Sequence, residues 1–281
     1  MKNNRRQQAD GEATSPVFRR EFLATAATAG SIGLAAATTA AQNKQPVKTP
    51  VKLNGAMIEY KSGDLVIPAY LSRPAKAQDA PAVLVIHEVF GLNDHIKSIA
   101  DRVAQAGYFA LAPHFFARST ETPPKDTSDI QALRKAAASI PPEAANRDMQ
   151  AALDYLKTVK GVRPRFASVG FCMGGAYSYR LSAHSKDLRG AVIFYGRIPL
   201  ELVPQVNCPI LGNFAEEDSG IPPAAVQAWI EAMNKAGKTV DAKIYPSARH
   251  GFFNDTRPEA YNAQAAADAW QRTIKFFGER L

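Results

Sequence analysis

A single hexapeptide limits the folds open to this chain. Residues 170–175 read Gly-Phe-Cys-Met-Gly-Gly and stand between a strand-like run at 166–169 and a helix-like run at 176–183. This layout matches a nucleophile elbow in which Cys172 takes the usual place of serine. We expect small residues two before and two after the cysteine, because larger side chains would clash where the strand turns sharply into the helix. The turn would lift the sulfur above the sheet and aim the Met173 amide at a developing oxyanion.

The rest of the pattern alternates between strands and helices. A hairpin is predicted at the start, from runs at 57–60 and 65–71 around Ser62-Gly63-Asp64. Near-continuous apolar strands then alternate with helical stretches, which indicates a mostly parallel, twisted α/β sheet covered by helices on both faces. The predicted strands are 82–87, 109–113, 166–169, 191–195, 210–214 and 239–245, and the predicted helices are 94–107, 130–138, 142–160, 176–183, 222–236 and 258–277.

The first 41 residues have the character of a targeting segment. Arg19-Arg20 with Phe22 and Leu23 precedes a weakly apolar run that ends in small residues, which resembles a bacterial twin-arginine signal. Phe18 departs from the usual Ser or Thr before the pair. A membrane anchor is the alternative, although a run so poor in Leu, Ile and Phe spans a bilayer badly. We therefore expect a signal at 1–41, a linker at 42–54, one domain at 55–281, and a periplasmic or secreted location.

Charge and cysteine content narrow the possible functions. The 281 residues carry a formal net charge of +8, but no Lys/Arg cluster interleaved with aromatics indicates nucleic-acid binding. A disulfide between Cys172 and Cys208 is possible after export, but Cys208 is better interpreted as a small buried side chain. No phosphate-binding loop, dinucleotide fingerprint or metal-ligand spacing is present, so no cofactor and no metal are predicted. The sequence does not indicate an oligomeric state.

Two later loops hold candidates for a base and its orienting acid. Asp218 follows the predicted strand 210–214, and His250 follows the strand 239–245. Both would therefore lie at the carboxyl ends of strands, where sites form in open parallel sheets. With Cys172 they stand in the order nucleophile, acid, histidine that accompanies a nucleophile elbow. The sequence thus predicts a Cys172, Asp218, His250 triad.

Each member of this set has a structural alternative. Asp218 can equally cap the helix that follows it, and Glu216 and Glu217 are rival acids in the same loop. His250 taken alone can be an ordinary surface histidine. Among the other histidines, His87 closes a core strand and is expected to be structural.

At this point the residues resemble a known family. The segments 86–93 (IHEVFGLN), 170–175 (GFCMGG), Asp218 with Ile221-Pro222, and 250–252 (HGF) are similar to those of the dienelactone hydrolase family, from about residue 55 to the end. The resemblance implies an α/β-hydrolase fold with a Cys-Asp-His triad. It also implies an activity, the opening of an enol-lactone by water through an acyl-enzyme on the cysteine.

The resemblance brings further roles. Glu88 matches the family glutamate that keeps the resting thiol uncharged and takes its proton when an anionic substrate binds. The amide of Val89 would be the second oxyanion donor beside that of Met173. Arg118, in the stretch 114–118, matches the arginine that binds the substrate carboxylate, with an ordinary surface arginine as the alternative. Tyr195, at the end of a predicted strand, is also a substrate-binding candidate.

One position departs from the family. A second carboxylate-binding arginine is expected four residues after the catalytic histidine, where this chain has Asn254. Arg257 lies three residues further on. An amide cannot form the bidentate, charge-assisted contact of arginine, so Asn254 would bind an anionic substrate less tightly or accept a different one.

Other functions stay open. The substrate partner is expected to be a small lactone or ester, with broad carboxylesterase or thioesterase activity as the alternative. A non-catalytic binder of acidic small molecules and a redox-active cysteine are the alternatives from other functional classes. Residues 118–142 are either a lid over the pocket or a plain surface excursion.

Overall fold

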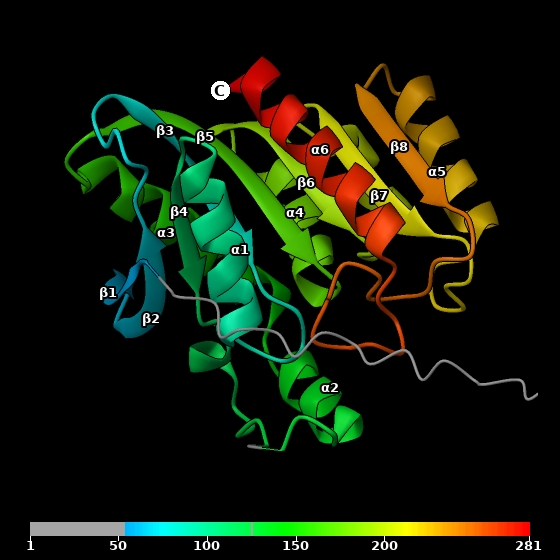
Figure 1. The fold of residues 1–281 in the computed structure, drawn as a ribbon, viewed down its shortest axis with the longest axis horizontal. Coiled ribbons are helices and arrows are strands. Elements are labelled where there is room, and N and C mark those ends of the chain that lie inside the picture. The colour runs from blue at the N-terminus through cyan, green and yellow to red at the C-terminus, as the bar shows by residue number, and fades with distance from the viewer. Residues whose placement is uncertain (1–53, 125) are drawn as a thin grey trace, which may run out of the picture. The chain divides into compact units, whose positions relative to one another are not determined.

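The computed structural model describes residues 54–124 and 126–281, so the predicted export signal and nearly all of the predicted linker lie outside the described residues. The elements of Figure 1 follow the predicted alternation of strands and helices. The strands are β1 (Ala56–Ser62), β2 (Leu65–Ser72), β3 (Ala80–Ile86), β4 (Phe109–Pro113), β5 (Val162–Phe171), β6 (Leu188–Phe194), β7 (Ile210–Ala215) and β8 (Val240–Tyr245). The helices are α1 (Asp94–Gln105), α2 (Ile130–Ala138), α3 (Pro142–Thr158), α4 (Met173–His184), α5 (Pro223–Lys235) and α6 (Ala263–Arg280), with short 3₁₀ turns η1 (Phe115–Arg118) and η2 (Leu200–Gln205).

The described strands form one mixed sheet in the order β1-β2-β4-β3-β5-β6-β7-β8. Strand β2 pairs antiparallel with both β1 and β4, whereas the pairs from β4 to β8 are parallel. This is the α/β-hydrolase type of sheet with the predicted N-terminal hairpin. The chain moves from β3 to β4 on one side and then crosses to β5 on the other. The carboxyl ends of β3 and β5 thus flank a switch point, the usual position of a ligand site in such sheets.

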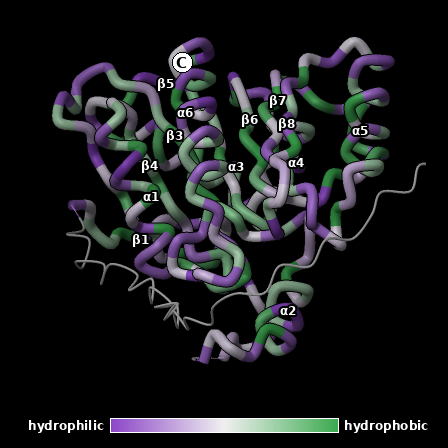
Figure 2. The backbone as a smooth tube through the Cα atoms, turned by 45° about the vertical axis from the view of Figure 1, so that its right-hand side comes forward, coloured by the Kyte–Doolittle hydropathy of each residue, from purple (hydrophilic) through white to green (hydrophobic). Residues whose placement is uncertain are grey.

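Helices cover both faces of this sheet. On one face, α3, α4 and α5 bury apolar stripes that include Leu153, Leu181 and Trp229. On the other face, α1 and α6 bury stripes that include Ile99 and Phe277. Figure 2 shows hydrophobic residues along the central strands and hydrophilic ones on the outer loops. The strands are near-continuous apolar runs because both of their faces are buried.

The register of the central strands brings candidate residues together. Ile86 at the end of β3 lies opposite Gly170 of β5, and Phe171 lies opposite Phe194 of β6. Glu88 follows Ile86 by two residues, and Cys172 follows its partner Gly170 by two residues. Both side chains therefore lie at the same point of the sheet edge. Sequence spacing alone does not reveal this proximity, because it depends on which strands are neighbours.

The last helix differs from its prediction. It was expected from Pro258, but α6 begins at Ala263 because the side chain of Asn262 accepts a hydrogen bond from the amide of Ala265 and caps the helix there. The preceding residues form turns, and the amide of Asn262 donates to the carbonyl of Phe252. These turns return the chain toward the loop that carries His250.

Candidate active site

Cys172 occupies a strained turn between β5 and α4. Its φ of 54° and ψ of −114° lie outside the regions that L residues ordinarily adopt. The amide of Cys172 donates to the carbonyl of Phe194 at 3.0 Å, which ties the turn to the neighbouring strand. Helix α4 begins at the next residue, Met173. This strand, turn and helix is the elbow that the hexapeptide predicted, and such strain at a single residue is typical of functional sites.

The glycines around the cysteine are required by close backbone packing. A Cβ on Gly170 would overlap the carbonyl oxygen of Gly174, and a Cβ on Gly174 would overlap the carbonyl oxygen of Ile86. Gly175 is equally restricted, because a Cβ there would lie 2.7 Å from the carbonyl oxygen of Phe194. The expectation of small residues on either side of Cys172 is therefore confirmed, with the obstructing atoms identified.

His250 and Asp218 form a close pair beside the elbow. The Nδ1 of His250 lies 2.6 Å from Oδ2 of Asp218, whose other oxygen accepts hydrogen bonds from the amides of Gly220 and Ile221. Asp218 is buried, whereas the His250 side chain is 43% exposed. One oxygen of the Asp218 carboxylate is fixed by the amides of its own loop, and the other contacts the imidazole of His250. These contacts set the orientation of the imidazole ring.

The rival acids have other partners. Glu217 pairs with Arg249 at 3.1 Å, and Glu216 accepts the amide of Ser247. Helix α5 has Pro222 at its N-cap and no side-chain cap, so capping of this helix by Asp218 was a wrong alternative. Of the three acids in this loop, Asp218 is the one that contacts His250.

The charges of this pair support one another. Burial lowers the pKa of His250, but hydrogen bonds to Asp218 and Cys172 and the negative charges of these groups raise it overall to about 10. Burial likewise raises the pKa of Asp218, but the hydrogen bond and charge of His250 together with the loop amides bring it below its ordinary value. The contact between the two side chains thus favours a protonated imidazole beside an ionised carboxylate.

Glu88 lies in the wall of the same site and is held by two neutral donors. Asn254 donates from Nδ2 to Oε2 of Glu88 at 2.6 Å, and the Tyr195 hydroxyl donates to Oε1 at 3.3 Å. The glutamate is 3% exposed. Burial raises its pKa above the ordinary value, although the charge of His95 and the hydrogen bond from Asn254 oppose the shift. Burial thus favours the protonated form of Glu88 more than it would for an exposed glutamate, and perturbed carboxyl groups of this kind are common at functional sites.

Asn254 and Tyr195 were both expected to contact substrate, but each donates a hydrogen bond to the Glu88 carboxyl group instead. Both are buried, and neither lines the cavity that contains Cys172. The Oδ1 of Asn254 also accepts from the amide and hydroxyl of Thr256, so both ends of its amide are occupied. The ring of Tyr195 packs 5.2 Å from that of His250, measured between centroids. Their geometry positions Glu88 and His250 rather than a ligand.

His87 stabilises the loop that carries Glu88 and Val89 through two hydrogen bonds. Its Nδ1 donates to the carbonyl of Glu88 at 2.6 Å, and its Nε2 accepts the amide of Phe115 at 3.0 Å. Burial lowers its pKa to about 3, so the ring stays neutral and can play both roles. The structural role expected for His87 is confirmed.

An aromatic cluster joins the cysteine loop to the histidine loop. Phe171, which precedes Cys172, stacks on Phe194 at 4.7 Å between centroids, and Phe253 packs on both rings at 5.2 and 4.8 Å. Phe253 follows His250 by three residues. Because such buried aromatic contacts add about 0.5–1.5 kcal/mol each beyond area burial, they give the two loops a common rigid support.

The two candidate oxyanion donors have free amides. Met173 is the first residue of α4, where a backbone N–H has no partner within the helix. Within the part of the chain that the structure describes, the amides of Val89 and Met173 have no hydrogen-bond acceptor. Val89 also lines the cavity beside Cys172. These amides are available for an anionic oxygen at this point.

A cavity of about 460 Å³ lies over these groups. Its lining includes Cys172 and His250 from the sheet edge, and Ile130 and Arg134 from α2. Figure 1 shows α2 beyond the carboxyl ends of the parallel strands. Helix α2, within the stretch 118–142, therefore provides part of the wall of this cavity.

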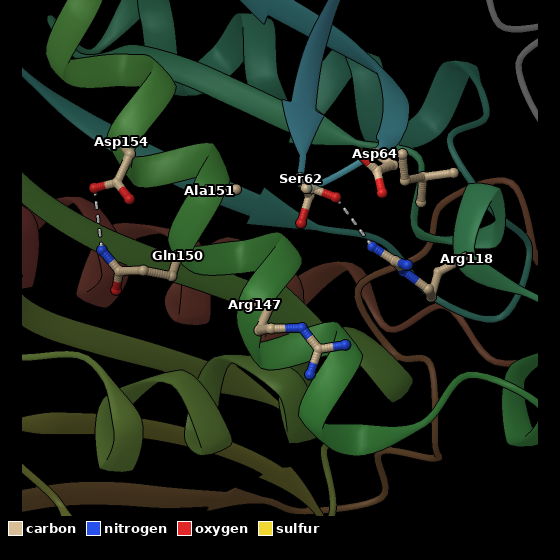
Figure 3. A pocket seen from close by; sticks show the side chains of 9 residues that line it. Ser62, Asp64, Arg118, Arg147, Gln150, Ala151 and Asp154 are labelled. Carbon is tan, nitrogen blue, oxygen red and sulfur yellow. Dashed lines mark hydrogen bonds between the residues drawn. The ribbon is translucent and has the colours of Figure 1, made fainter.

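Arg118 does not line this cavity. Its guanidinium is bound to the carboxylate of Asp148, with Nε at 2.9 Å from Oδ2 and Nη2 at 2.6 Å from Oδ1. It borders a different hollow, shown in Figure 3, which Ser62, Asp64 and Arg147 also line. The expected contact of Arg118 with a substrate carboxylate is corrected accordingly, because a buried acid already occupies the fork of its guanidinium.

Arg134 also belongs to the site, although the sequence pattern did not identify it. The cavity lining contains three arginines, namely Arg134, Arg249 and Arg257. The sequence signal for Arg134 was available, since Ile130 and Arg134 are four residues apart and share one face of the predicted helix 130–138. What the sequence lacked was the position of that helix relative to the cysteine.

The described part of the chain, residues 54–124 and 126–281, holds no metal-ligand cluster, no membrane-spanning helix and no disulfide. No three His, Cys, Asp or Glu side chains come together there as ligands of a metal ion. Within residues 54–124 and 126–281, no helix is both long enough and apolar enough to cross a bilayer. Cys172 and Cys208 are both free, so the disulfide alternative was wrong.

Residues 67–281 match the model of the dienelactone hydrolase family. A relative from Methylorubrum extorquens, named as a carboxymethylenebutenolidase, is 33% identical over 277 residues, covering 94% of each chain. One from Saccharolobus solfataricus with the same name is 36% identical over 256 residues, covering 78% of this chain and 96% of the relative.

A solved structure is similar as well. The crystal structure described as a dienelactone hydrolase from Klebsiella pneumoniae superposes with a TM-score of 0.76 at 29% identity, covering 80% of this chain and 98% of the other. The described domain therefore shares its fold with this protein over nearly the whole of that chain.

Proposed function

The chain belongs to the dienelactone hydrolase family and is a carboxylic-ester hydrolase; from this premise we propose that it opens an enol-lactone or a related activated ester through an acyl-enzyme on Cys172. The observation that carries the proposal is the 2.6 Å pair of His250 and Asp218 in the cavity that Cys172 also lines. Nucleophile, base and orienting acid are the parts that covalent ester hydrolysis needs.

The first half of the reaction forms the acyl-enzyme. The Cys172 thiolate attacks the ester carbonyl, and the carbonyl oxygen becomes an oxyanion that the amides of Val89 and Met173 stabilise. Collapse of this intermediate breaks the bond between the carbonyl carbon and the ester oxygen. His250 gives its proton to the departing enolate or alkoxide oxygen, which in a lactone stays tethered to the acyl group.

The second half returns the enzyme to its starting state. In the thioester the sulfur carries no charge, so two of the contributions that raise the pKa of His250 are lost. The neutral imidazole can then take a proton from water, whose oxygen attacks the thioester carbonyl. The sulfur leaves as thiolate, and the product forms as a carboxylic acid that releases its proton to solvent and departs as a carboxylate, so one water molecule is consumed in each cycle.

Glu88 has the proton-handling role that the family resemblance implies. Its raised pKa, and its fixed position between Asn254 and Tyr195, suit a group that takes the thiol proton as substrate binds. His250 and Glu88 would then both favour the thiolate.

The proposal is tested by ester hydrolysis. Purified protein is assayed with an anionic dienelactone, a neutral enol-lactone and a 4-nitrophenyl ester, each with wild type and with Cys172→Ala. Turnover of a lactone that requires Cys172 supports the proposal. Cys172-dependent turnover of neutral esters alone would move the function to a general carboxylesterase or thioesterase, and activity independent of Cys172 would overturn the mechanism.

We also propose that residues 1–41 direct export through the twin-arginine pathway to the periplasm or beyond. Support comes from the Arg19-Arg20 pair and the small residues at 39–41. Replacing both arginines by lysine is expected to retain the protein in the cytoplasm, measured by cell fractionation. An unchanged periplasmic fraction would contradict this assignment.

A further inference from the structure

The charged side chains that line the cavity are almost all matched in pairs. Arg249 pairs with Glu217 at 3.1 Å, and Arg257 pairs with Glu259 at 2.7 Å. His250 is matched in the same way by Asp218, and Glu88 is held by neutral donors. Among the basic side chains of this lining, all of them in the described part of the chain, Arg134 is the one without an acidic partner.

Helix α2 presents Arg134 to the cavity by its local geometry. The Asp129 side chain accepts the amide of Ala132 and sets the start of the helix. Ile130 and Arg134 lie one turn apart on the face that lines the cavity, whereas Leu133 is buried against the core. The next residue, Lys135, points elsewhere and pairs with Glu121 at 3.1 Å.

The other two arginines are poorly placed to receive a new anion. Arg257 is held by Glu259 and also stacks over the ring of Phe90 at 4.9 Å from the centroid. Arg249 would have to leave Glu217. A substrate carboxylate that binds either one competes with a carboxylate already present, whereas Arg134 offers an unoccupied planar fork that suits bidentate binding.

We propose that Arg134 is the specificity-determining residue that recognises a carboxylate of the substrate, so that selection of anionic esters resides on helix α2. This inference rests on the proposed ester hydrolysis. It assigns to this chain a carboxylate contact that neither Arg118 nor Asn254 makes, since both are bound to internal acids. The scissile carbonyl would lie at Cys172, and the anionic end would reach the wall of the cavity formed by α2.

The test compares two esters that share the same leaving group, 4-nitrophenolate. Mono-4-nitrophenyl adipate carries a terminal carboxylate, and 4-nitrophenyl hexanoate has the same six-carbon acyl chain without it. The readout is the ratio of kcat/KM for the anionic ester to kcat/KM for the neutral one. We expect Arg134→Gln to lower this ratio by about tenfold or more, the usual size of a lost charge-assisted contact, and Arg134→Lys to retain part of it.

Lys135→Gln is the matched control, since it removes one positive charge from the adjacent residue of the same helix, outside the cavity lining. Its ratio should stay at the wild-type value. An unchanged ratio in Arg134→Gln, or an equal loss in Lys135→Gln, would overturn the proposal, because the first denies any contact and the second indicates only a general field effect.

A binding measurement separates this proposal from the proposed reaction. Calorimetry with Cys172→Ala and the adipate monoester gives a Kd that does not depend on turnover, and adding Arg134→Gln should weaken it by about tenfold. If wild type hydrolyses neither ester and this Kd still rises, the proposed reaction fails and the Arg134 contact stands. If both proteins bind the monoester equally, the Arg134 contact fails whatever the activity.

Discussion

The guanidinium of Arg118 forms a bidentate ion pair with the carboxylate of Asp148, at 2.6 and 2.9 Å. The Asp148 side chain is 0% exposed, and that of Arg118 is 25% exposed. The pair joins η1 to α3, two elements that approach each other only in the folded chain. An arginine that family resemblance assigns to substrate therefore contributes to the fold instead.

Arg118→Met is expected to destabilise the protein by about 3–5 kcal/mol, because it leaves the buried Asp148 carboxylate without its counter-ion. Hydrolysis by the folded fraction should keep its preference between anionic and neutral esters. Urea unfolding and the kcat/KM ratio measure the two effects. Arg147→Met is the control, since Arg147 lines the same hollow, is exposed and has no ion pair among the described residues; a change within about 0.5 kcal/mol is expected.

Replacing Cys172 by alanine should lower kcat by roughly a thousandfold or more, because the covalent step loses its nucleophile. The fold should persist, since the amide of residue 172 still donates to Phe194. Ester hydrolysis and circular dichroism report the two outcomes. Activity close to that of wild type in a folded Cys172→Ala protein would refute the acyl-enzyme mechanism.

Asp218→Asn should lower kcat by roughly a hundredfold to ten-thousandfold, because the amide cannot stabilise the imidazolium form of His250 in the same orientation. Glu217→Gln in the same loop provides the comparison. Its partner Arg249 is an exposed arginine, so little change in kcat is expected. Equal losses in the two variants would mean that the loop as a whole matters, rather than the contact between Asp218 and His250.

The raised pKa of His250 makes a prediction about stability and pH. The histidine is protonated in both states below about pH 6.5, its ordinary value, and in the folded state alone between there and about pH 10. Its contribution is therefore complete below about 6.5 and is lost as the pH rises toward 10. Because the side chain is 43% exposed, solvent screens part of the effect.

The measurement is the unfolding free energy of wild type minus that of His250→Asn, taken from pH 6 to pH 10. This difference should shrink as the pH rises. In a Cys172→Ala background the decline should occur at lower pH, because the sulfur no longer helps to hold the proton on His250. A difference that grows with pH would contradict the assigned direction of the shift.

The elbow glycines give a prediction that concerns the backbone alone. Gly174→Ala should destabilise the protein by more than about 3 kcal/mol, because its Cβ would overlap the carbonyl oxygen of Ile86. Gly278→Ala, inside α6 with its nearest neighbour at 3.9 Å, should instead stabilise it by about 0.5–1 kcal/mol through helix propensity. Thermal unfolding of both variants tests the contrast, and similar melting temperatures would show that the elbow tolerates a methyl group.

Sequence alone determined the elements whose causes are local. The hairpin follows from its turn residues, and the strands follow from their apolar runs. The elbow glycines follow from steric limits within a few residues, and the order of Cys172, Asp218 and His250 is read directly along the chain. Element ends were less well determined: β5 begins four residues before its predicted start, and α6 begins five residues after its own, because its cap at Asn262 depends on turns that the helical pattern does not record.

Only the tertiary structure decided which charges meet. Arg118 pairs with an acid 30 residues away, and Asn254 contacts a glutamate 166 residues away. Arg134 reaches the cavity because of how α2 is placed beyond the sheet. Such partnerships depend on which strands are neighbours and on which charges burial forces into pairs, and neither is encoded by spacing along the chain.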